Sequence, residues 1–214
     1  MERIVYRELD SKDFVQLEKL LRETWDFSRY TKDRALLDAK YKEYLSAGLD
    51  VSTYGEVAVW GDEIIGFLLG AIDGEPPLAG AKINHEILLA ARREISKLGG
   101  GGGRSNMWAE AEEYYKEALR AIPSVKGHIE LFIVGKKSQG HGVGKQLLKH
   151  FEETFRREAD GIFYVQTDSM CNYRFYDAQG FTLCGSKKLT HDDGSPFELF
   201  LYTCLLYTSP SPRD

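Results

Sequence analysis

The fold is decided by residues 139–145, which read Gln139-Gly140-His141-Gly142-Val143-Gly144-Lys145. An apolar run before them, His-Ile-Glu-Leu-Phe-Ile-Val at 128–134, indicates a strand. Residues 143–157 after them predict an amphipathic helix, whose apolar stripe consists of Val143, Leu147, Leu148, Phe151 and Phe155. Glycines let a backbone approach a ligand closely, and the free amides of a first helical turn favour an anion. The stretch therefore predicts a pyrophosphate-binding loop or, on the glycines alone, a helix entrance without a ligand.

A second motif follows at 172–181, Asn172-Tyr173-Arg174-Phe175-Tyr176-Asp177-Ala178-Gln179-Gly180-Phe181. With both motifs the sequence resembles the GCN5-related N-acetyltransferase (GNAT) superfamily. The acyl-CoA loop of that family has the pattern Arg/Gln-x-x-Gly-x-Gly/Ala, which Gln139, Gly142 and Gly144 match. The second motif resembles the family segment Asn-x-x-Phe-Tyr-x-x-x-Gly-Phe. The resemblance covers residues 3–73 and 127–204, and 128–181 is its specific part.

Strand and helix patterns elsewhere agree with an α/β fold of this family. Residue alternation and turn signals predict strands at 3–8, 55–60, 63–72, 161–167, 181–188 and 197–204. Helical periodicity predicts a helix after a cap at Asp10 or Ser11, a second helix at 32–47 and a short one at 171–179. The resemblance implies a mixed, mostly antiparallel sheet of six or seven strands flanked by helices. In it the strands at 128–134 and 161–167 would splay apart, with acetyl-CoA in the gap.

The resemblance also implies which residues bind acetyl-CoA. Main-chain groups without a ladder partner at Phe132, Ile133 and Val134 would bind the pantetheine arm, and one amide would polarise the thioester carbonyl. The pyrophosphate would be bound at Gln139, Gly140, His141, Gly142, Val143, Gly144 and Lys145. In such enzymes the residue at Asn172 caps the short helix and lies near the cofactor, and a cap alone is the alternative role.

Acetyl transfer to an amine also needs a base, because an ammonium with a pKa of about 10.4 must lose its proton before it attacks. His128 and Glu130 share one face of their strand, at positions where family members place a catalytic Glu or His. We take Glu130 as the base and expect its apolar strand neighbours to raise the pKa of its carboxyl. His128 would share this role or line the pocket. A solvated or ion-paired strand carboxylate is the alternative for Glu130.

An acid is needed at the other end of the reaction, where the CoA thiolate departs. Tyr176 matches the family tyrosine that protonates this thiolate, and a phenol with a pKa of about 10 stays a donor at neutral pH. A core tyrosine is the alternative. Cys171 lies close in sequence but receives no nucleophilic role, because the superfamily generally transfers the acetyl group directly in a ternary complex.

These residues predict an N-acetyltransferase that transfers an acetyl group from acetyl-CoA to a primary amine, with a small molecule favoured as the acceptor. Three alternatives stay open. One is a protein N-terminal or lysine acetyltransferase, another is a non-catalytic acyl-CoA sensor, and the third is a structural interaction domain. No metal is expected.

Composition narrows these classes further. With 214 residues, 43% of them hydrophobic, the chain fits one large domain, which we assign to 1–206. A formal charge of -5 disfavours nucleic acid as a partner. The three cysteines, Cys171, Cys184 and Cys204, lack C-x-x-C spacing and favour a reducing, cytoplasmic compartment. Without an apolar h-region or a run of 18 apolar residues, neither secretion nor a membrane span is predicted.

Three segments depart from the family pattern. Residues 74–126 predict a two-helix insertion, with helices at 81–98 and 106–121, that would serve as a surface buttress, a dimer contact or a border of the acceptor site. A homodimer is therefore left open. The connection 24–31 holds Trp25, Phe27 and Tyr30, which we interpret as rings that cover the core. Residues 207–214 are predicted to be disordered and non-native.

Overall fold

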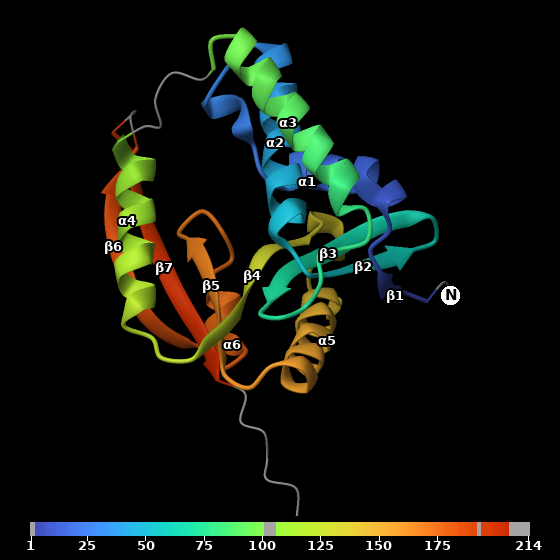
Figure 1. Cartoon of the computed structure of the whole chain (residues 1–214), viewed down its shortest axis with the longest axis vertical. Coiled ribbons are helices and arrows are strands. Elements are labelled where there is room, and N and C mark those ends of the chain that lie inside the picture. Colours follow the sequence, from blue (N-terminus) through green and yellow to red (C-terminus); the bar gives the residue numbers. More distant parts are fainter. Residues whose placement is uncertain (1–2, 101–105, 192–193, 206–214) are drawn as a thin grey trace, which may run out of the picture. The chain divides into compact units, whose positions relative to one another are not determined.

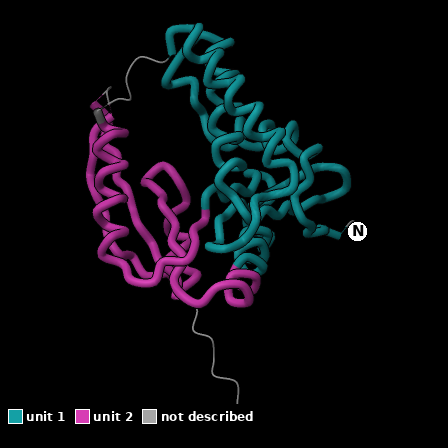
Figure 2. Tube along the Cα trace, in the orientation of Figure 1, with its two compact units in different colours: residues 1–102, 130–151 teal, residues 103–129, 152–214 magenta. Residues whose placement is uncertain are grey.

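The computed structural model describes residues 3–100, 106–191 and 194–205. Contacts between Cα atoms divide the chain into two compact units (Figure 2). Unit 1 comprises Met1–Gly102 and Glu130–Phe151, and unit 2 comprises Gly103–Ile129 and Glu152–Asp214. The single domain expected over 1–206 stays a prediction. The predicted tail at 207–214 lies outside the described residues.

The chain contains both strands and helices (Figure 1). The strands are β1 (Val5–Glu8), β2 (Tyr54–Trp60), β3 (Glu63–Ile72), β4 (Val125–Val134), β5 (Ile162–Asp168), β6 (Thr182–Thr190) and β7 (Pro196–Leu205). The α-helices are α1 (Phe14–Thr24), α2 (Arg34–Val51), α3 (Ala81–Lys97), α4 (Asn106–Arg120), α5 (Val143–Glu158) and α6 (Arg174–Ala178). Short 3-10 turns occur at η1 (Ser11–Asp13), η2 (Phe27–Arg29) and η3 (Lys136–Ser138).

The strands form a seven-stranded sheet in the order β1-β2-β3-β4-β5-β7-β6. The pairs β1–β2, β2–β3, β5–β7 and β6–β7 are antiparallel, whereas β4 and β5 are parallel. The predicted mixed, mostly antiparallel sheet flanked by helices is confirmed. Strand β4 belongs to both units: its residues from Val125 to Ile129 pair with β5, and residues 130–134 lie in unit 1. The splaying of β4 from β5 stays a prediction.

The 3-10 turn η1, which leads directly into helix α1 of unit 1, begins with a capping box. The Asp10 carboxylate accepts the amide of Lys12 at 3.0 Å, and the Asp13 carboxylate accepts the amide of Asp10 at 2.9 Å. Asp13 also accepts both guanidinium nitrogens of Arg7 from β1, at 2.6 and 2.8 Å. These bonds satisfy amides that a helix start leaves without a partner, and they tie the helix to the first strand.

The core of unit 1 lies between one face of the sheet and helices α1 and α2. Its buried members are Leu17, Leu20, Leu21, Tyr41, Leu45, Leu49, Val57, Ile64, Phe67, Leu69, Leu131 and Ile133. Trp25 and Phe27 pack against this core, so two of the three rings of the connection 24–31 cover it as interpreted from the sequence. Tyr30 is 45% exposed and does not.

Helix α5 covers the other face of the sheet in unit 1. A Cβ added to Gly66 of β3 would lie 3.1 Å from the carbonyl oxygen of Ile133 and 3.2 Å from Val143, so a side chain here would crowd both β4 and the helix. Tyr54 of β2 meets Phe151 edge to face at 5.2 Å. All five residues of the predicted apolar stripe are buried, which confirms the predicted amphipathic helix.

In unit 2, helix α4 packs against β6 and β7 (Figure 1). The buried contact is formed by Met107, Ala111, Leu189, Phe197 and Leu199. The hydroxyl of Tyr115 donates to the carbonyl of Thr167, near the end of β5, at 2.9 Å. This helix therefore serves as a cover for one part of the unit 2 sheet.

The two helices predicted for the insertion are present as α3 and α4, but they belong to different units. Helix α3 packs along α2 in unit 1, where His85 pairs with Asp50 at 3.0 Å and Arg92 pairs with Glu43 at 3.2 Å. Helix α4 is joined to β6 by the ion pair of Glu110 and Lys187, at 2.9 Å. Each helix of the insertion thus extends a different unit.

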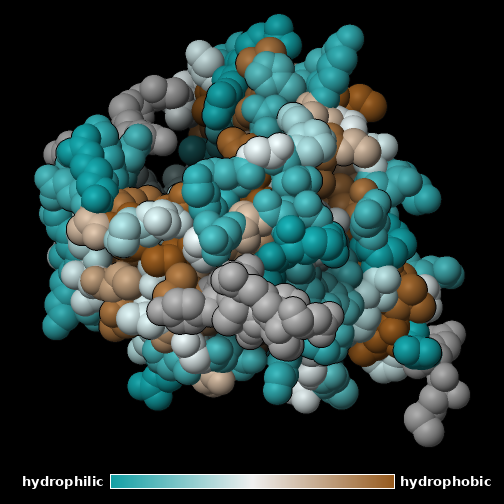
Figure 3. All heavy atoms as spheres, turned by 60° about the horizontal axis from the view of Figure 1, so that its bottom comes forward, coloured by the Kyte–Doolittle hydropathy of each residue, from teal (hydrophilic) through white to brown (hydrophobic). Residues whose placement is uncertain are grey.

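The face drawn in Figure 3 mixes hydrophilic side chains with small groups of hydrophobic ones. Scattered exposed apolar residues are ordinary on a folded protein. Among the described helices, none is both long and apolar enough to cross a lipid bilayer.

Candidate active site

The predicted pyrophosphate loop is an exposed turn of unit 1 between η3 and α5. Gly140 and Gly142 have φ angles of 81° and 78°, in the left-handed region that favours glycine. In the described part of the chain, no atom lies within 4 Å of the place where a Cβ at either position would stand. Conformation rather than lack of space therefore requires these two glycines, and the side of the loop that faces away from the protein is open to a ligand.

The first turn of α5 begins directly after this loop. The amide of Gln146 donates to the carbonyl of Gly142 at 3.0 Å. Val143 is 1% exposed and anchors the turn in the core, so it contributes its amide and not its side chain to the surface. The amides at the start of a helix have no intrahelical acceptor and carry the positive end of the dipole. With Lys145 exposed beside them, this helix start can bind an anion.

Two side chains of the loop brace the loop itself. Gln139 donates from Nε2 to the carbonyl of Val134 at 3.3 Å, which ties the loop to the end of β4. The Nδ1 atom of His141 lies 3.1 Å from the carbonyl oxygen of Gln139. Both contacts hold a side chain of the loop against a main-chain carbonyl. A direct contact of either side chain with acetyl-CoA stays a prediction.

The end of β4 offers main-chain atoms more than side chains. Ile133 is buried in the core of unit 1, and Phe132 and Val134 are half-buried. The amide of Gly135 donates to the carbonyl of Ile65 in β3 at 2.9 Å, which holds the strand end against its neighbour. The predicted pantetheine contacts of 132–134 would therefore use the main chain.

Glu130 is exposed on β4, which differs from the apolar setting expected for it. Its sequence neighbours Ile129 and Leu131 are buried, and strand alternation points them to the opposite face from Glu130. They therefore do not surround the carboxylate. A Cβ added to Gly48 of α2 would stand 3.5 Å from Cγ of Glu130, so the carboxylate emerges beside this helix.

His128 belongs to unit 2 and is held by its strand partner. Its ring stacks on Tyr164 of β5, with centroids 5.2 Å apart and planes inclined by 20°. The two residues are direct partners in the β4–β5 register. The imidazole is half-buried, and this stacking fixes its plane.

Tyr176 lies in α6 of unit 2 and is 7% exposed. Its ring contacts Phe175 at 5.6 Å, Phe181 at 5.3 Å and Tyr202 at 5.7 Å between centroids. Burial raises the pKa of its phenol well above the usual range, and the nearby Cys171 adds to the rise. The phenol therefore remains protonated, as a proton donor must.

Asn172 is exposed ahead of α6, and its main chain begins the turn that leads into this helix. Its carbonyl accepts the amide of Phe175 at 3.0 Å. The N-cap of α6 is Tyr173, without a side-chain capping bond, so the expected cap by the Asn172 side chain is not the one observed. The ring of Tyr173 instead stacks on Phe200 of β7, with centroids 4.3 Å apart. A cofactor contact of Asn172 stays a prediction.

Cys171 precedes this segment and is half-buried. Burial raises the pKa of its thiol to about 12, with a further contribution from Asp168. A thiol with such a pKa is a poor nucleophile at neutral pH, in agreement with the absence of a nucleophilic role for Cys171. In the residues that the structure describes, no group of three or more His, Cys, Asp or Glu side chains could hold a metal ion.

Unit 1 also contains a polar network that the sequence does not predict. His150 of α5 places Nδ1 2.8 Å from Oε1 of Glu56 in β2, and its Nε2 contacts the side-chain amide of Gln146. Tyr54 donates to the other carboxylate oxygen of Glu56 at 3.2 Å. If Nδ1 carries the proton for Glu56, Nε2 accepts from Gln146. The network thus joins β2 to Gln146. The main-chain amide of Gln146 in turn donates to the carbonyl of Gly142 in the glycine-rich loop.

A signal for this network was present in the sequence. His150 falls on the apolar stripe of α5, seven residues after Val143, so it had to face the sheet. Burial raises the pKa of the Glu56 carboxyl, although the hydrogen bond to His150 acts in the opposite direction. A histidine on a buried stripe thus indicates a buried polar partner, but not which residue it is.

Comparison with known proteins agrees with this architecture. Residues 102–197 match a family model described as "Acetyltransferase (GNAT) domain". No curated protein matches the sequence. The match confirms the predicted resemblance and the predicted class of enzyme, an acyltransferase that uses acetyl-CoA.

Solved structures of acetyltransferases share the fold. An apo form of a mutant agmatine N-acetyltransferase is similar with a TM-score of 0.62 at 16% identity, covering 95% of this chain and 99% of that one. A polyamine N-acetyltransferase from Drosophila melanogaster gives 0.61 at 17%, covering 95% and 100%. A histone acetyltransferase HPA2 and related acetyltransferase from Corynebacterium glutamicum gives 0.59 at 20%, covering 98% and 100%. At these identities the likeness establishes the fold.

Proposed function

Since the chain carries a GNAT acetyltransferase domain, we propose that it transfers an acetyl group from acetyl-CoA to a primary amine, with a small molecule as the acceptor. The observation that carries the proposal is the open loop of Gly140 and Gly142, both at positive φ, in front of the first turn of α5. This loop suits a pyrophosphate, because its amides and the helix dipole both favour negative charge.

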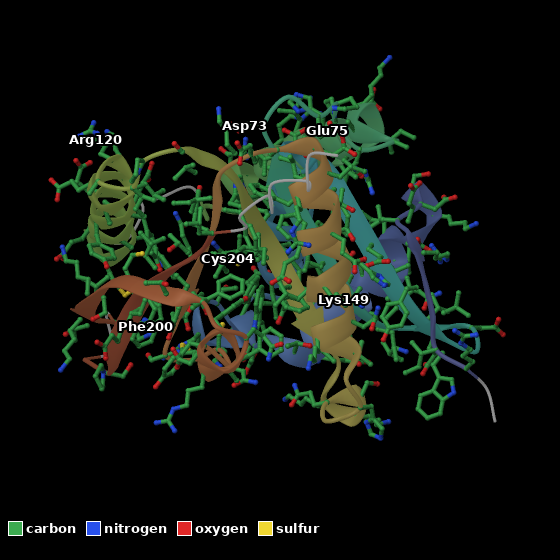
Figure 4. The ribbon with its side chains drawn as sticks, turned by 90° about the horizontal axis from the view of Figure 1, so that it is seen from below. Asp73, Glu75, Arg120, Lys149, Phe200 and Cys204 are labelled. Atoms are coloured by element: carbon green, nitrogen blue, oxygen red, sulfur yellow. The ribbon has the colours of Figure 1, made fainter. Side chains whose placement is uncertain are left out.

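In this proposal acetyl-CoA is held largely by main-chain groups. The amides of 139–145 bind the pyrophosphate, and the main chain of 132–134 binds the pantetheine arm. Asn172 contributes a further contact. Lys145 adds charge attraction from the first turn of α5, and Lys149 follows one turn later on the same helix (Figure 4).

Glu130 then serves as the base that removes a proton from the amine, and His128 assists or lines the pocket. An exposed carboxylate can do this directly or through a water molecule. A main-chain amide of 132–134 stabilises the negative charge that develops on the thioester oxygen. Tyr176 donates its phenolic proton to the departing thiolate, and burial keeps the phenol protonated until that step.

The acceptor is proposed from the substrates of similar structures. Agmatine and polyamines are small amines, and two of the similar structures are acetyltransferases that act on them. The name of a third includes histone acetyltransferase, so a protein N-terminus or a lysine side chain is the second candidate. A reducing, cytoplasmic location suits three free cysteines, of which the thiols of Cys171 and Cys204 have pKa values raised to about 12 by burial.

Thiol release from acetyl-CoA in the presence of primary amines tests the proposal. Glu130→Gln should lower kcat about 100-fold near neutral pH, because the base is lost. The defect should shrink as the pH approaches the pKa of the amine, about 10.4, where the acceptor no longer needs a base. Glu63→Gln, on the exposed start of β3, is the matched control and should leave kcat unchanged. Binding of acetyl-CoA without amine-dependent thiol release would instead indicate an acyl-CoA sensor.

A further inference from the structure

The proposed reaction leaves Tyr176 without its proton at the end of each cycle. Once the phenol has protonated the CoA thiolate, its O–H bond must form again before the next thiolate can depart. Tyr176 is 7% exposed, and its ring is enclosed by Phe175, Phe181 and Tyr202. A phenolate in such apolar surroundings is costly, so the proton must return through neighbouring polar groups.

The thiol of Cys171 is a polar group that lies near this phenol. Cys171 stands five residues before Tyr176, in the turn after β5, where its amide donates to the carbonyl of Asp168 at 3.1 Å. The chain then turns again, because the amide of Tyr176 donates to the carbonyl of Tyr173 at 3.0 Å. After burial, the charge of the Cys171 sulfur is the second cause of the raised pKa of the Tyr176 phenol. The two side chains are therefore near neighbours.

The carboxyl of Asp168 connects this thiol to the surface. The two groups lie close enough for a hydrogen bond between them to affect the pKa of each. One carboxyl oxygen of Asp168, Oδ1, also accepts the amide of Met170 at 2.7 Å, which fixes the carboxyl within the turn. Asp168 is half-buried, and Ser169 and Met170 beside it are exposed. The carboxyl can therefore exchange a proton with water.

The acidities of the three groups suit transfer toward Tyr176. An ordinary carboxyl is more acidic than a thiol, and a thiol is more acidic than a phenol. Burial raises the pKa of the Cys171 thiol to about 12 and that of the Tyr176 phenol well above its usual range. Burial also raises the pKa of the Asp168 carboxyl, although hydrogen bonds from Met170 and Cys171 act in the opposite direction. A proton that enters at Asp168 thus moves to stronger bases.

Two other hydroxyls of unit 2 are engaged with different acceptors. Tyr202, whose ring contacts that of Tyr176, donates to Asp177 at 2.9 Å. Tyr115 donates to the main-chain carbonyl of Thr167 at 2.9 Å, and a carbonyl has no proton to return. Tyr202 is therefore the rival source of a proton for Tyr176, and the experiment below includes it.

We propose that Cys171 and Asp168 form a proton relay that reprotonates Tyr176 after each turnover. The phenolate takes the thiol proton, so an S–H bond breaks and an O–H bond forms. The thiolate then takes a proton from the Asp168 carboxyl, which recovers one from water. The amine releases a proton to solvent through Glu130 in the same cycle, so the protons balance.

This inference rests on the proposed function and adds two residues to it. Cys171 and Asp168 act through Tyr176 and do not touch the substrate. Cys171 thereby gains a role in the reaction without becoming a nucleophile.

A comparison of single-turnover and steady-state thiol release tests the relay, with the primary amine that gives the highest kcat. Tyr176 begins protonated, so Cys171→Ala in excess over acetyl-CoA should release thiol at the wild-type rate. With both substrates in excess, its kcat should fall about tenfold, because each later cycle waits for the proton. Asp168→Asn should show the same split. Cys171→Ser should restore most of kcat, since a hydroxyl donates one proton while it accepts another.

Two variants serve as controls and should keep both rates. Cys204→Ala removes another half-buried cysteine of unit 2, whose thiol pKa burial also raises to about 12. Tyr202→Phe removes the rival hydroxyl. If Tyr202→Phe showed the split and Cys171→Ala did not, the proton would return through Tyr202 and the inference would be wrong.

The remaining outcomes separate the relay from the proposed function. If Cys171→Ala lowered both rates equally and Cys171→Ser did not restore them, Cys171 would have a structural role only, and the relay would be overturned. Thiol release that neither Cys171→Ala nor Asp168→Asn alters also overturns the relay, and it leaves the acetyltransferase proposal standing. A wild type that releases no thiol in either regime overturns both.

Discussion

The glycine-rich loop 139–145 of unit 1 and the Tyr176 segment of unit 2 both match family motifs, but they are built in opposite ways. The loop is exposed and depends on main-chain conformation, with Gly140 and Gly142 at positive φ and nothing packed around them. The Tyr176 segment depends on side chains, since the phenol is enclosed by Phe175, Phe181 and Tyr202. The first motif therefore preserves a main-chain conformation that suits binding. The second motif preserves both the packing of its rings and a hydroxyl group that is proposed to act in the reaction.

This difference tells which changes each region tolerates. In the loop, any side chain at a glycine strains the backbone, and a negative one also opposes an anion. In the Tyr176 segment, removal of a ring would open a cavity, so only the hydroxyl can be deleted without disturbing the fold. The variants below use that distinction, from the largest expected effect to the smallest.

Gly142→Glu should break the loop. The substitution places a carboxylate at φ 78° where the pyrophosphate is proposed to bind, so the Kd for acetyl-CoA should rise roughly 100-fold or more. Gly74→Glu is the matched control, because Gly74 has φ 90° and equally open surroundings outside the loop. Acetyl-CoA protection in thermal unfolding measures both. If both variants lost this protection equally, the strain and the added charge would weaken acetyl-CoA binding wherever they are introduced, and the loop would not be the site.

Tyr176→Phe should separate chemistry from packing. The ring stays, so the fold and the Kd for acetyl-CoA should hold, while kcat falls about 100-fold through loss of the proton donor. Tyr202→Phe is the control: it deletes a neighbouring hydroxyl that donates to Asp177 at 2.9 Å and should retain kcat. Unchanged turnover in Tyr176→Phe would remove this residue from the mechanism.

The pH profile sharpens the same assignment. Burial raises the pKa of the Tyr176 phenol, so the group is protonated, and active as a donor, throughout the neutral and mildly alkaline range. The kcat of the wild type should therefore show no decline between about pH 7 and pH 9.5 from this group. A loss of kcat in that window that Tyr176→Phe abolishes would contradict the raised pKa.

The pair of Glu56 and His150 should contribute to the stability of unit 1 and the placement of α5. His150→Ala leaves the Glu56 carboxylate, 12% exposed, without this partner, and should cost about 1–3 kcal/mol in the free energy of unfolding. The expected change in the Kd for acetyl-CoA is smaller than that of Gly142→Glu. Urea unfolding measures the first quantity and calorimetry the second. An unfolding free energy equal to that of the wild type would show that the pair is dispensable.

Stability against pH gives this pair a signature of its own. Burial raises the folded-state pKa of Glu56 above its usual 4.5, so its contribution to stability is greatest below that value and is lost as the pH rises through the folded-state pKa. Relative to Glu56→Gln, the wild type should lose stability between about pH 4 and pH 7. An opposite slope would mean that the hydrogen bond to His150 outweighs desolvation.

Lys145→Ala should have the smallest effect. The ammonium is exposed, so its attraction to a phosphate is screened, and the Kd for acetyl-CoA should rise about two- to fivefold. The effect should vanish at high salt. Lys12→Ala is the control, because it removes an exposed lysine in η1, outside the loop. A hundredfold loss would indicate that charge, and not the main chain, dominates the loop.

Local patterns in the sequence were enough for much of the fold and for the loop. The stripe from Val143 to Phe155 has helical spacing, and all of its residues are buried. The two glycines follow a strand and precede a helix, which is the setting that makes their positive φ useful. Such features depend on residues close together in the chain, so periodicity and turn chemistry can find them.

Features that depend on distant segments could not be predicted in this way. Glu56 and His150 are 94 residues apart, and only the packing of α5 on the sheet brings them together. For Glu130 the difference is local: its apolar sequence neighbours predict apolar surroundings, but strand alternation sends their side chains to the other face.

Calorimetric titration of the chain with acetyl-CoA tests the central claim most directly. The account predicts binding at one site with a Kd in the micromolar range, which Gly142→Glu abolishes and Gly74→Glu preserves. If the wild type produced no heat and acetyl-CoA left its thermal unfolding unchanged, the loop would not be a cofactor site. The acetyltransferase proposal would then be contradicted.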